Sequence, residues 1–243
     1  MSLPQGYDLR TFDELDGTNA EALRAGCPHG RVIVAESQTA GRGRRHRIWQ
    51  SPPGNLYLTI CVQPSAGRPA GQLAFVAGLA VLDTVSELAP TATFALKWPN
   101  DVLCDGRKIS GILIEAGAGG GFAVGIGINL AQAPPDEEVT FPATSLGAVY
   151  GGEITPKSAL EPLCRHFDRW YRLWLAGGFD PLRAIWLASA HGIGDTIAAS
   201  TGSDRIEGRF EGLDEEGALI LVDADGERCA IAAGDVFFSQ RTD

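Results

Sequence analysis

Two kinds of hydrophobic pattern divide the chain. In the first part, strand-like apolar runs alternate with longer segments in which apolar residues recur at helical spacing. Strands are expected at 31–38, 55–62, 94–104, 107–115 and 122–130, and helices at 18–25, 71–88, 157–178 and 180–190. From about residue 190, short β-like pieces are interrupted by Gly, Asp and Ser at close spacing. This second pattern is typical of a small antiparallel barrel or sandwich.

Two of the expected helices carry boundary signals. Thr18 followed by Glu21 has the form of a capping box, and Gly26 supplies a stop. Thr155 and Pro156 place an N-cap and a first-turn proline ahead of the long helix that follows. These signals predict where the helices begin and end, and they give Thr18 a structural role.

The change of pattern predicts two domains. We expect residues 1–189 to form a larger α+β domain and residues 190–243 to form a small β-barrel domain. A chain of 243 residues is long enough to bury a sizeable core in this arrangement. The motifs that carry chemistry all fall in the larger domain.

Bulk composition excludes several classes of function. The formal net charge is −10, whereas a surface that binds duplex nucleic acid normally shows a basic excess. The first ten residues lack an apolar signal region, and no stretch approaches the roughly 18 uncharged apolar residues of a membrane span. The five cysteines are far apart and form no CxxC pair, which argues against a metal site or a disulfide framework. We therefore expect a cytoplasmic protein that binds neither membrane nor nucleic acid.

One short loop departs from the acidic average. Residues 40–49, AGRGRRHRIW, here called the arginine loop, hold four arginines and a histidine within six positions. Glycines expose backbone amides and permit tight turns, while arginines offer forked donors for phosphate and carboxylate oxygens. Three interpretations fit this pattern: a site for an anionic small molecule, a site for a polyanion, and a basic loop that is merely solvated. The acidic net charge of the chain argues against the polyanion site.

Lysine is rare in this chain, which has only three. Two of them, Lys97 and Lys108, lie within one stretch of 12 residues. A lysine is a compact point charge with a movable pKa, which suits a single donor that must meet phosphate or carboxylate oxygens. An ordinary hairpin with solvated charges explains the same two residues.

The dipeptide Asp105-Gly106 between the two lysines is a strong hairpin signal, and it predicts a register. Leu103 is expected opposite Lys108, and Asp101 opposite Ser110, so that these four side chains share one face of the sheet. Lys97 has the same parity, although the proline two positions later interrupts the ladder.

The strand at 122–130, FAVGIGINL, has almost no side chains on one face. Ala123, Gly125, Gly127 and Asn129 alternate there with larger apolar residues. Such a face admits a flat ligand or another backbone at close range, and close packing of a helix explains it equally well.

Three motifs follow one another along the chain: ESQTAGRGRRHRIWQSPPGNLYLT, then KWPNDVLCDGRKISGILIE, then GIGINL. In this order they resemble the biotin protein ligases, which attach biotin to the carrier domains of biotin-dependent carboxylases. The similarity covers most of the chain and includes the C-terminal GRFEGLDEEGALIL. It implies a mixed β-sheet flanked by helices, of the class II aminoacyl-tRNA synthetase-like type, with a small SH3-like β-barrel. The first catalytic motif begins about 16 residues from the start, so we expect the form without an N-terminal DNA-binding domain.

The resemblance implies a two-step reaction. Biotin carboxylate attacks the α-phosphate of MgATP to give biotinyl-5′-AMP and pyrophosphate, and a carrier lysine then attacks this mixed anhydride and releases AMP. ATP and biotin are the expected substrates, Mg²⁺ accompanies ATP, and no metal site of the protein's own is expected. The expected partner is a biotin carboxyl carrier protein domain, and the oligomeric state stays open, a homodimer included. Both steps gather negative charge that fixed cations and amides stabilise.

Matching positions carry the family's functional residues onto this chain. Lys108 corresponds to the lysine that contacts carboxylate and phosphate, and Asp101 to a residue that orients or deprotonates the incoming amine. The expected catalytic residues are Lys108, Arg44, Asp101 and Asn100. The expected biotin contacts are Gly17, Thr18, Asn19, Gln38, Arg42, Gly43, Arg44, Lys108 and Gly111. The expected nucleotide contacts are Arg45, Arg47, Trp49, Lys97, Asn100 and Asn129.

Two positions depart from the family pattern. Gly17 stands where serine is common, which removes a hydroxyl from the expected biotin site. His46 replaces a frequent glycine, so we expect a stiffer or partly pH-sensitive arginine loop, which otherwise serves as a mobile lid over the intermediate.

Two other functions stay open. Lipoate or octanoate attachment uses the same catalytic fold, and a non-catalytic biotin-binding module would retain the adenylate without transferring it. The polar residues Thr18, Asn19 and Gln38 favour a ureido ring over an aliphatic tail.

Overall fold

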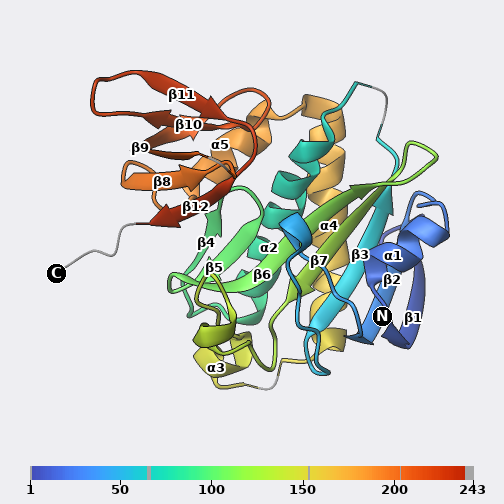
Figure 1. The fold of residues 1–243 in the computed structure, drawn as a ribbon. Helices are drawn as coiled ribbons and strands as arrows, with labels where there is room; N and C mark the ends of the chain where they lie inside the picture. The colour runs from blue at the N-terminus through green and yellow to red at the C-terminus, as the bar shows by residue number, and fades with distance from the viewer. Residues whose placement is uncertain (1, 65–66, 153, 203, 239–243) are drawn as a thin grey trace.

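The computed structural model describes residues 2–64, 67–152, 154–202 and 204–238, which form two β-sheets and a layer of helices (Figure 1). The strands of the large sheet are β1 (Asp8–Leu15), β2 (Arg31–Gln38), β3 (Leu56–Val62), β4 (Phe94–Lys97), β5 (Asp101–Cys104), β6 (Arg107–Ala116) and β7 (Phe122–Ile128). The strands of the small sheet are β8 (Thr196–Ser200), β9 (Arg205–Leu213), β10 (Leu219–Val222), β11 (Arg228–Ile231) and β12 (Asp235–Phe238). The helices are α1 (Thr18–Arg24), α2 (Leu73–Leu88), α3 (Leu146–Tyr150), α4 (Pro156–Gly177) and α5 (Asp180–Ala188).

The large sheet is mixed and has the strand order β1-β2-β3-β7-β6-β5-β4. β1 and β2 run parallel, and all other neighbours are antiparallel. The prediction of a mixed sheet flanked by helices is therefore confirmed. The sequence did not indicate β1, because every residue of this edge strand is exposed or half-buried and the strand contains no buried apolar run.

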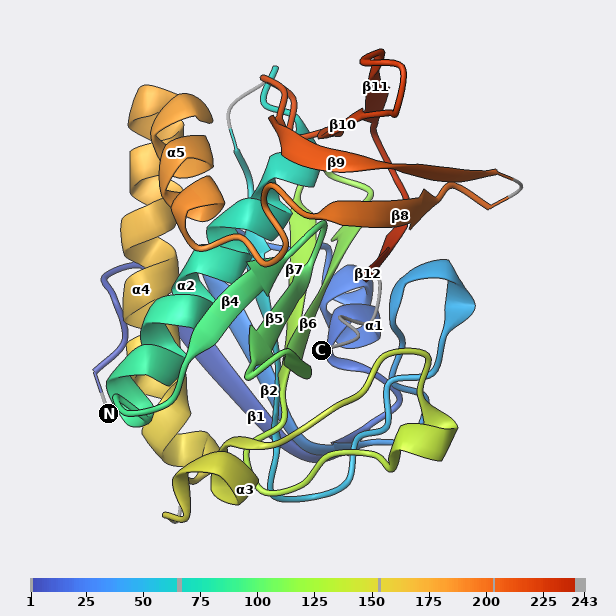
Figure 2. The ribbon, with the colours of Figure 1, turned by 90° about the vertical axis from the view of Figure 1, so that its left-hand side faces the viewer.

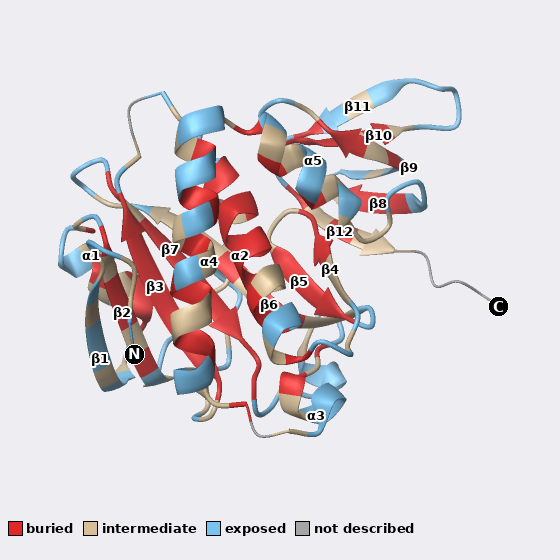
Figure 3. Ribbon diagram, turned by 180° about the vertical axis from the view of Figure 1, so that it is seen from behind, coloured by how far each residue is buried: buried red, intermediate tan, exposed pale blue. Residues whose placement is uncertain are grey.

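Two long helices cover one face of the large sheet, as the view from behind shows (Figure 3). α2 is buried on most sides because it lies between the sheet and α4. α4 is amphipathic and starts as predicted, with Thr155 as N-cap and Pro156 in the first turn. By length and composition alone Ala70–Leu88 also resembles a membrane span, but 61% of that window is buried inside the protein, as in a core helix.

The small sheet is antiparallel, with the strand order β11-β10-β9-β8-β12, and it lies at one end of the large sheet (Figures 1 and 2). This agrees with the predicted SH3-like C-terminal domain. The two sheets share one apolar core, and polar contacts join them as well. The indole of Trp98 donates to the carbonyl of Gly217 at 3.0 Å, and a Cβ at Gly217 would lie 2.6 Å from the ring of Phe75.

The capping box predicted at α1 is wrong. Gly17 is the N-cap, and its carbonyl accepts from the amide of Glu21 at 3.0 Å. The hydroxyl of Thr18 donates to Oε1 of Gln38 at 3.3 Å instead of capping the helix. The predicted stop is confirmed, because the helix ends just before Gly26, which has a φ of 77°.

The register predicted for the β5–β6 hairpin is correct next to the turn and wrong beyond it. Leu103 pairs with Lys108 as expected, but a β-bulge follows, and Asp101 pairs with Gly111 instead of Ser110. A bulge inserts one extra residue into one strand, so the side chains beyond it point to the opposite face of the sheet from the one predicted. As a result Gly111, rather than Ser110, lies on the same face as Asp101 and Lys108.

Candidate active site

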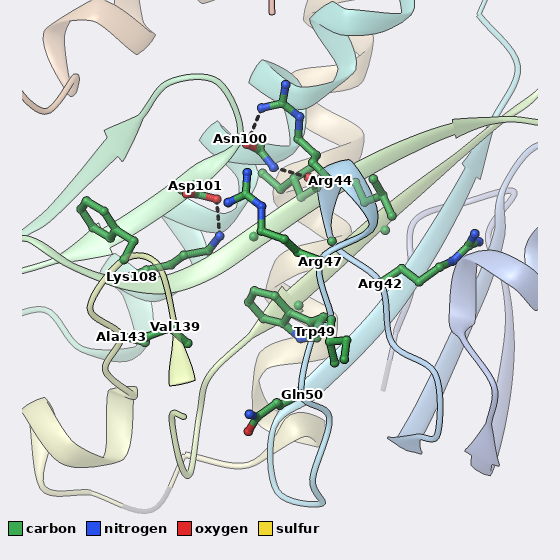
Figure 4. Close-up of a pocket in the computed structure, with 18 of the residues that line it drawn as sticks. Arg42, Arg44, Arg47, Trp49, Gln50, Asn100, Asp101, Lys108, Val139 and Ala143 are labelled. Carbon is green, nitrogen blue, oxygen red and sulfur yellow. Dashed lines mark hydrogen bonds and ion pairs between the residues drawn. The ribbon is translucent and has the colours of Figure 1, made fainter. Parts of the chain in front are cut away.

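A cavity of about 450 Å³ opens on the face of the large sheet opposite α2 and α4. Strand alternation separates the two faces: the side chain of Ile112 reaches the position of Gly78 in α2, while Gly111 and Leu113 on either side of it line the cavity, which Ile112 also borders. The arginine loop and the segment 134–143 form part of the wall (Figure 4), and residues of α1 and β12 complete it.

The bare face of β7 receives side chains from two other elements. A Cβ at Gly125 would collide with the side chain of Asn19, and a Cβ at Gly127 would lie 2.5 Å from the indole of Trp49. A Cβ at Gly111 on β6 would also meet that indole, at 2.9 Å. Packing of α1 through Asn19 thus explains Gly125, and packing of the Trp49 indole explains Gly127 and Gly111.

Two lysines share one carboxylate at the base of the β5–β6 hairpin. Asp101 lies 2.6 Å from Nζ of Lys108 and 3.5 Å from Nζ of Lys97 (Figure 4). The side chain of Lys97 is 6% exposed, whereas that of Lys108 is 22% exposed. Lys108 is therefore the ammonium group of this cluster that a bound molecule reaches more readily.

Burial and charge act in opposite directions on this cluster. Burial raises the pKa of the Asp101 carboxyl, but Lys108 and Lys97 outweigh burial and hold that pKa below its ordinary value. Burial lowers the pKa of Lys97, and the neighbouring charge of Lys108 lowers it further, while Asp101 opposes both effects. The ring of Phe141 lies 4.4 Å from the Lys97 ammonium group and favours its charged form by a cation–π contact. The cluster thus keeps an ionised carboxylate between two lysines.

Arg44 connects the arginine loop to the sheet and to the small domain. It lies in a short 3₁₀ turn, Arg44–His46, at the tip of the loop. Its guanidinium donates to Oδ1 of Asn100 and to the carbonyl of Gly234, both at 3.2 Å. Asn100 in turn donates to the carbonyl of Ile112 at 2.6 Å, so the tip is linked to β6 (Figure 4).

The next two arginines of the loop meet one carboxylate of the small domain. Arg45 lies 3.2 Å from Oδ2 of Asp235, the first residue of β12, and Arg47 pairs with the same oxygen. Burial raises the pKa of Asp235, but the guanidinium groups of Arg47, Arg45 and Arg44 together lower it below its ordinary value. Two of the predicted nucleotide contacts are thus already paired with a carboxylate of the protein.

The tip of the loop has a backbone conformation that glycine adopts more readily. Arg45 has a φ of 53° and His46 a φ of 59°, both in the left-handed region. For residues with a side chain this region costs roughly 1–2 kcal/mol. A glycine, which the resemblance predicts at position 46, would remove that cost.

The opposite end of the cavity is formed by neutral polar side chains. Gln38 accepts from the backbone amide of Thr18 at 2.9 Å. Asn19 accepts from the hydroxyl of Thr59 at 2.6 Å and donates to Glu115 at 2.9 Å. Asn19 is therefore fixed from both sides, and its orientation does not depend on a bound molecule.

Arg42 and Gly17 flank this polar end. Arg42 points away from Lys108 and pairs with Glu115 at 3.1 Å (Figure 4). Gly17 has extended backbone with a φ of −176°, and the atom nearest to a Cβ there lies 3.8 Å away. Nothing in the surroundings of Gly17 therefore requires glycine.

The structure brings nearly all predicted site residues together. The cavity lining includes Gly17, Thr18, Asn19, Gln38, Arg42, Gly43, Arg44, Arg47, Trp49, Lys97, Asn100, Asp101, Lys108, Gly111 and Asn129. Arg45 lies outside the lining, because it extends to the small domain. The sequence did not indicate the remaining wall, which includes Glu138, Val139, Thr140, Phe141, Asp235, Val236 and Phe237. Neither residues 138–141 nor residues 235–237 carry a sequence motif, and both segments are far from the arginine loop along the chain.

Acidic side chains do not gather into a metal site in the part of the chain that the structure describes, where no group of three His, Cys, Asp or Glu residues is suitably placed. Asp101, which lies nearest to Lys108, is already engaged by two lysines.

Comparison with known protein families gives two matches along the chain. Residues 16–132 match the biotin/lipoate A/B protein ligase family, and residues 192–239 match the biotin protein ligase C-terminal domain. The first match contains the arginine loop, Lys97 and Lys108, and the second contains Asp235.

Individual relatives are similar over most of their length. The chain is 44% identical to a biotin acetyl-CoA-carboxylase ligase of Paracoccus denitrificans over 92% of this chain and 97% of that protein. It is 35% identical to the bifunctional ligase/repressor BirA of Bacillus subtilis over 89% of this chain and 67% of that protein. Among solved structures, the biotin protein ligase of Aquifex aeolicus in complex with biotin and ATP superposes with a TM-score of 0.87 at 29% identity, covering 96% of this chain and 99% of that one.

Proposed function

We infer that this chain, which belongs to the biotin and lipoate protein ligase family, is an ATP-dependent biotin protein ligase. Relatives that share most of its length are named biotin ligases, and its C-terminal part matches the C-terminal domain of biotin protein ligases. One structural observation carries the inference: a single cavity joins neutral polar groups at one end with the Lys108–Asp101 pair at the other.

The reaction has two steps that balance without a redox partner. An oxygen of the biotin carboxylate forms a bond to the α-phosphorus of ATP, and the bond to pyrophosphate breaks. A neutral lysine amine of the acceptor then attacks the carbonyl of biotinyl-5′-AMP, the bond to AMP breaks, and the amine releases a proton. Negative charge gathers on the oxygens in both steps, and preorganised cations stabilise it most where water is excluded.

We assign the centre of this reaction to the hairpin. Lys108 is the more exposed lysine of its cluster, and Asp101 fixes the position of its ammonium group through the 2.6 Å ion pair. Arg44 and Asn100 are assigned to the neighbouring wall, where Arg44 donates to Oδ1 of Asn100 and the amide of Asn100 donates to the carbonyl of Ile112. Lys97 is buried behind them and is assigned to holding Asp101 rather than to contacting substrate.

The polar end is assigned to the ring of biotin. Thr18, Asn19 and Gln38 present hydroxyl and amide groups that suit the donors and acceptors of a ureido ring. Gly17 leaves room beside them, Gly43 and Gly111 also line the cavity, and Arg42 closes the rim through Glu115. Trp49 and Asn129 then form the wall on the nucleotide side, where the indole offers a flat apolar surface.

Mg²⁺ is treated as part of the nucleotide substrate. The triphosphate supplies oxygen ligands of its own, and hard oxygen ligands are those that Mg²⁺ prefers.

The acceptor is proposed to be the biotin carrier domain of a carboxylase, since the similar protein of Paracoccus denitrificans is named a biotin acetyl-CoA-carboxylase ligase. Residues 1–189 are proposed as the catalytic domain and 190–243 as the terminal domain. The segment 189–195, which separates α5 from β8 along the chain, supports this division. The cytoplasm is proposed as the compartment, supported by five cysteines that are all free thiols.

A transfer assay tests the proposal. Purified protein, biotin and MgATP are incubated with a biotin carrier domain and, in parallel, with a lipoyl domain and lipoate. We expect biotin-dependent exchange of pyrophosphate into ATP and labelling of the carrier lysine. Labelling of the lipoyl domain in preference would identify a lipoate ligase, and tight biotinyl-AMP without labelling of either acceptor would identify a binding module.

A further inference from the structure

The arginine loop and the small domain meet through β12. Arg45 and Arg47 share Oδ2 of Asp235, and Arg45 also donates to the carbonyl of Ser200 at 3.4 Å. The Asp235 side chain is 22% exposed, and it lines the cavity together with the next two residues of β12. The small domain therefore forms part of the cavity wall.

Asp235 is held in place by the backbone around it. It pairs with Ser200 across the β8–β12 ladder. The residue before it, Gly234, approaches the other strand so closely that a Cβ would lie 2.9 Å from the carbonyl oxygen of Ser200. The carboxylate therefore belongs to a rigid sheet, whereas the arginines belong to a loop.

The three arginines that follow Gly43 are used in two ways. Arg45 and Arg47 point to the Asp235 carboxylate, which neutralises part of their charge. Arg44 donates to two neutral oxygens, one on Asn100 and one on the backbone beside Asp235, so its guanidinium is held next to the hairpin without a direct ion pair to Asp235. The anchors and this guanidinium are thus adjacent in sequence.

We propose that Asp235 is a positioning residue that ties Arg45 and Arg47 to the small domain and thereby directs Arg44 toward Asn100, beside the Lys108–Asp101 pair. Charge-assisted hydrogen bonds of this kind are about twice as strong as neutral ones, and two of them end on one carboxylate. The kinetic consequence of this positioning rests on the proposed ligase function. The structural consequence, that the arginine loop is tethered to the small domain, does not depend on the ligase function.

Amide hydrogen exchange of the arginine loop tests the tether without any substrate. Three amides report on the closed loop: Gly43 donates to the carbonyl of Arg47 at 2.7 Å, Arg47 to that of Arg44 at 3.2 Å, and Trp49 to that of Gly41 at 2.9 Å. In the full-length Asp235→Asn protein we expect these amides to exchange about tenfold faster, since opening free energies set exchange rates. Asp235→Glu, which keeps the charge, is expected to restore most of the protection.

Glu207→Gln is the matched control. Glu207 lies on the same sheet and pairs with the exposed Arg205 at 3.3 Å, outside the residues that line the cavity. In Glu207→Gln we expect the amides of the arginine loop to exchange at the wild-type rate. Equal loop protection in Asp235→Asn and Glu207→Gln would overturn the proposal, and so would faster exchange spread over β8 and β9, which would indicate a damaged sheet.

Steady-state kinetics distinguish positioning from competition with phosphate. If Asp235 positions Arg44, Asp235→Asn lowers kcat/KM for biotin-dependent pyrophosphate exchange about tenfold. A lower KM for ATP with unchanged kcat would instead show that Asp235 competes with phosphate for the arginines, and that result contradicts the proposal. A wild-type protein without exchange activity would refute the ligase function, while the hydrogen-exchange result would still decide the tether.

Discussion

Lys108 and Arg44 reach the same cavity from two regions that are built differently. The β5–β6 hairpin is part of the buried sheet, and its Lys108 shares with Lys97 of β4 a carboxylate that is itself almost fully enclosed. The arginine loop is held by a few polar contacts at its tip and by one indole at its base. The fixed region is suited to meeting the reacting atoms, and the loop is suited to opening for a substrate and closing over it.

The largest effect is expected where the buried cluster is broken. Asp101→Asn leaves Lys97 and Lys108 without their shared carboxylate, and removing one partner of a buried pair typically costs about 3–5 kcal/mol. Denaturant unfolding at pH 7 measures this loss. Asp136→Asn is the control, because it removes an exposed partner of Arg107 and should cost less than about 1 kcal/mol.

The same variant has a defined pH dependence. The folded-state pKa of Asp101 is lowered, so its stabilising contribution is present above the unfolded value of about 3.9 and is lost as the pH falls through the folded value. Wild-type protein should therefore lose this contribution in acid, whereas Asp101→Asn should lack that part of the acid dependence. Parallel acid titrations of the two proteins would contradict the assignment.

Loss of the fixed cation should have the largest effect on catalysis. Lys108→Ala is expected to slow biotin-dependent pyrophosphate exchange by about 10²–10³-fold, the range for removal of one preorganised donor. Lys157→Ala is the control, because Lys157 is exposed in the first turn of α4, away from the cavity lining. Exchange rates of the two variants that differ by less than tenfold would remove Lys108 from the centre of the reaction.

An intermediate effect is expected where the loop packs on the sheet. In Gly127→Ala the new Cβ would lie 2.5 Å from the Trp49 indole, and overpacking of this kind costs about 1–3 kcal/mol. Gly212→Ala adds a Cβ to β9 where no atom lies within 4 Å, so its unfolding free energy should change little. Similar unfolding free energies for both variants would show that the base of the loop is not held by packing.

The smallest effect is expected at an exposed contact of the loop. Arg45→Gln removes one of two arginines from Asp235, and exposed ion pairs contribute about 0–1 kcal/mol. Because exposed charges are screened by salt, the difference from wild type should vanish at about 1 M salt. Thermal unfolding in low and high salt measures this, and a difference that persists at high salt would mean that Arg45 acts by packing.

These two regions also mark how far sequence reasoning extends. The strands, the hairpin turn and the basic loop were predicted, because apolar periodicity, Asp105-Gly106 and clustered arginines are local signals. The partner of Asp101 was predicted wrongly, because a β-bulge leaves no local signal and reverses the alternation that follows it. The identity of the loop's anchor was missed for another reason: Asp235 is 188 positions from Arg47, and only tertiary packing brings them together.

The structure also changed the interpretation of single residues. Thr18 was expected to cap α1, but the Thr18 side chain contacts Gln38, and Gly17 is the N-cap residue. Gly17 and His46 were singled out as departures from the family pattern, and they differ physically. Gly17 has room for a side chain, whereas His46 holds a left-handed conformation that favours glycine.

The long separation between the arginine loop and Asp235 matters for the protein while it is being made. Arg45 is translated 190 residues before Asp235. At synthesis rates of about 5–20 residues per second, the loop spends roughly ten to forty seconds without its carboxylate partner. The contacts that tie the tip of the arginine loop to the small domain can therefore form only after β12 has been synthesised.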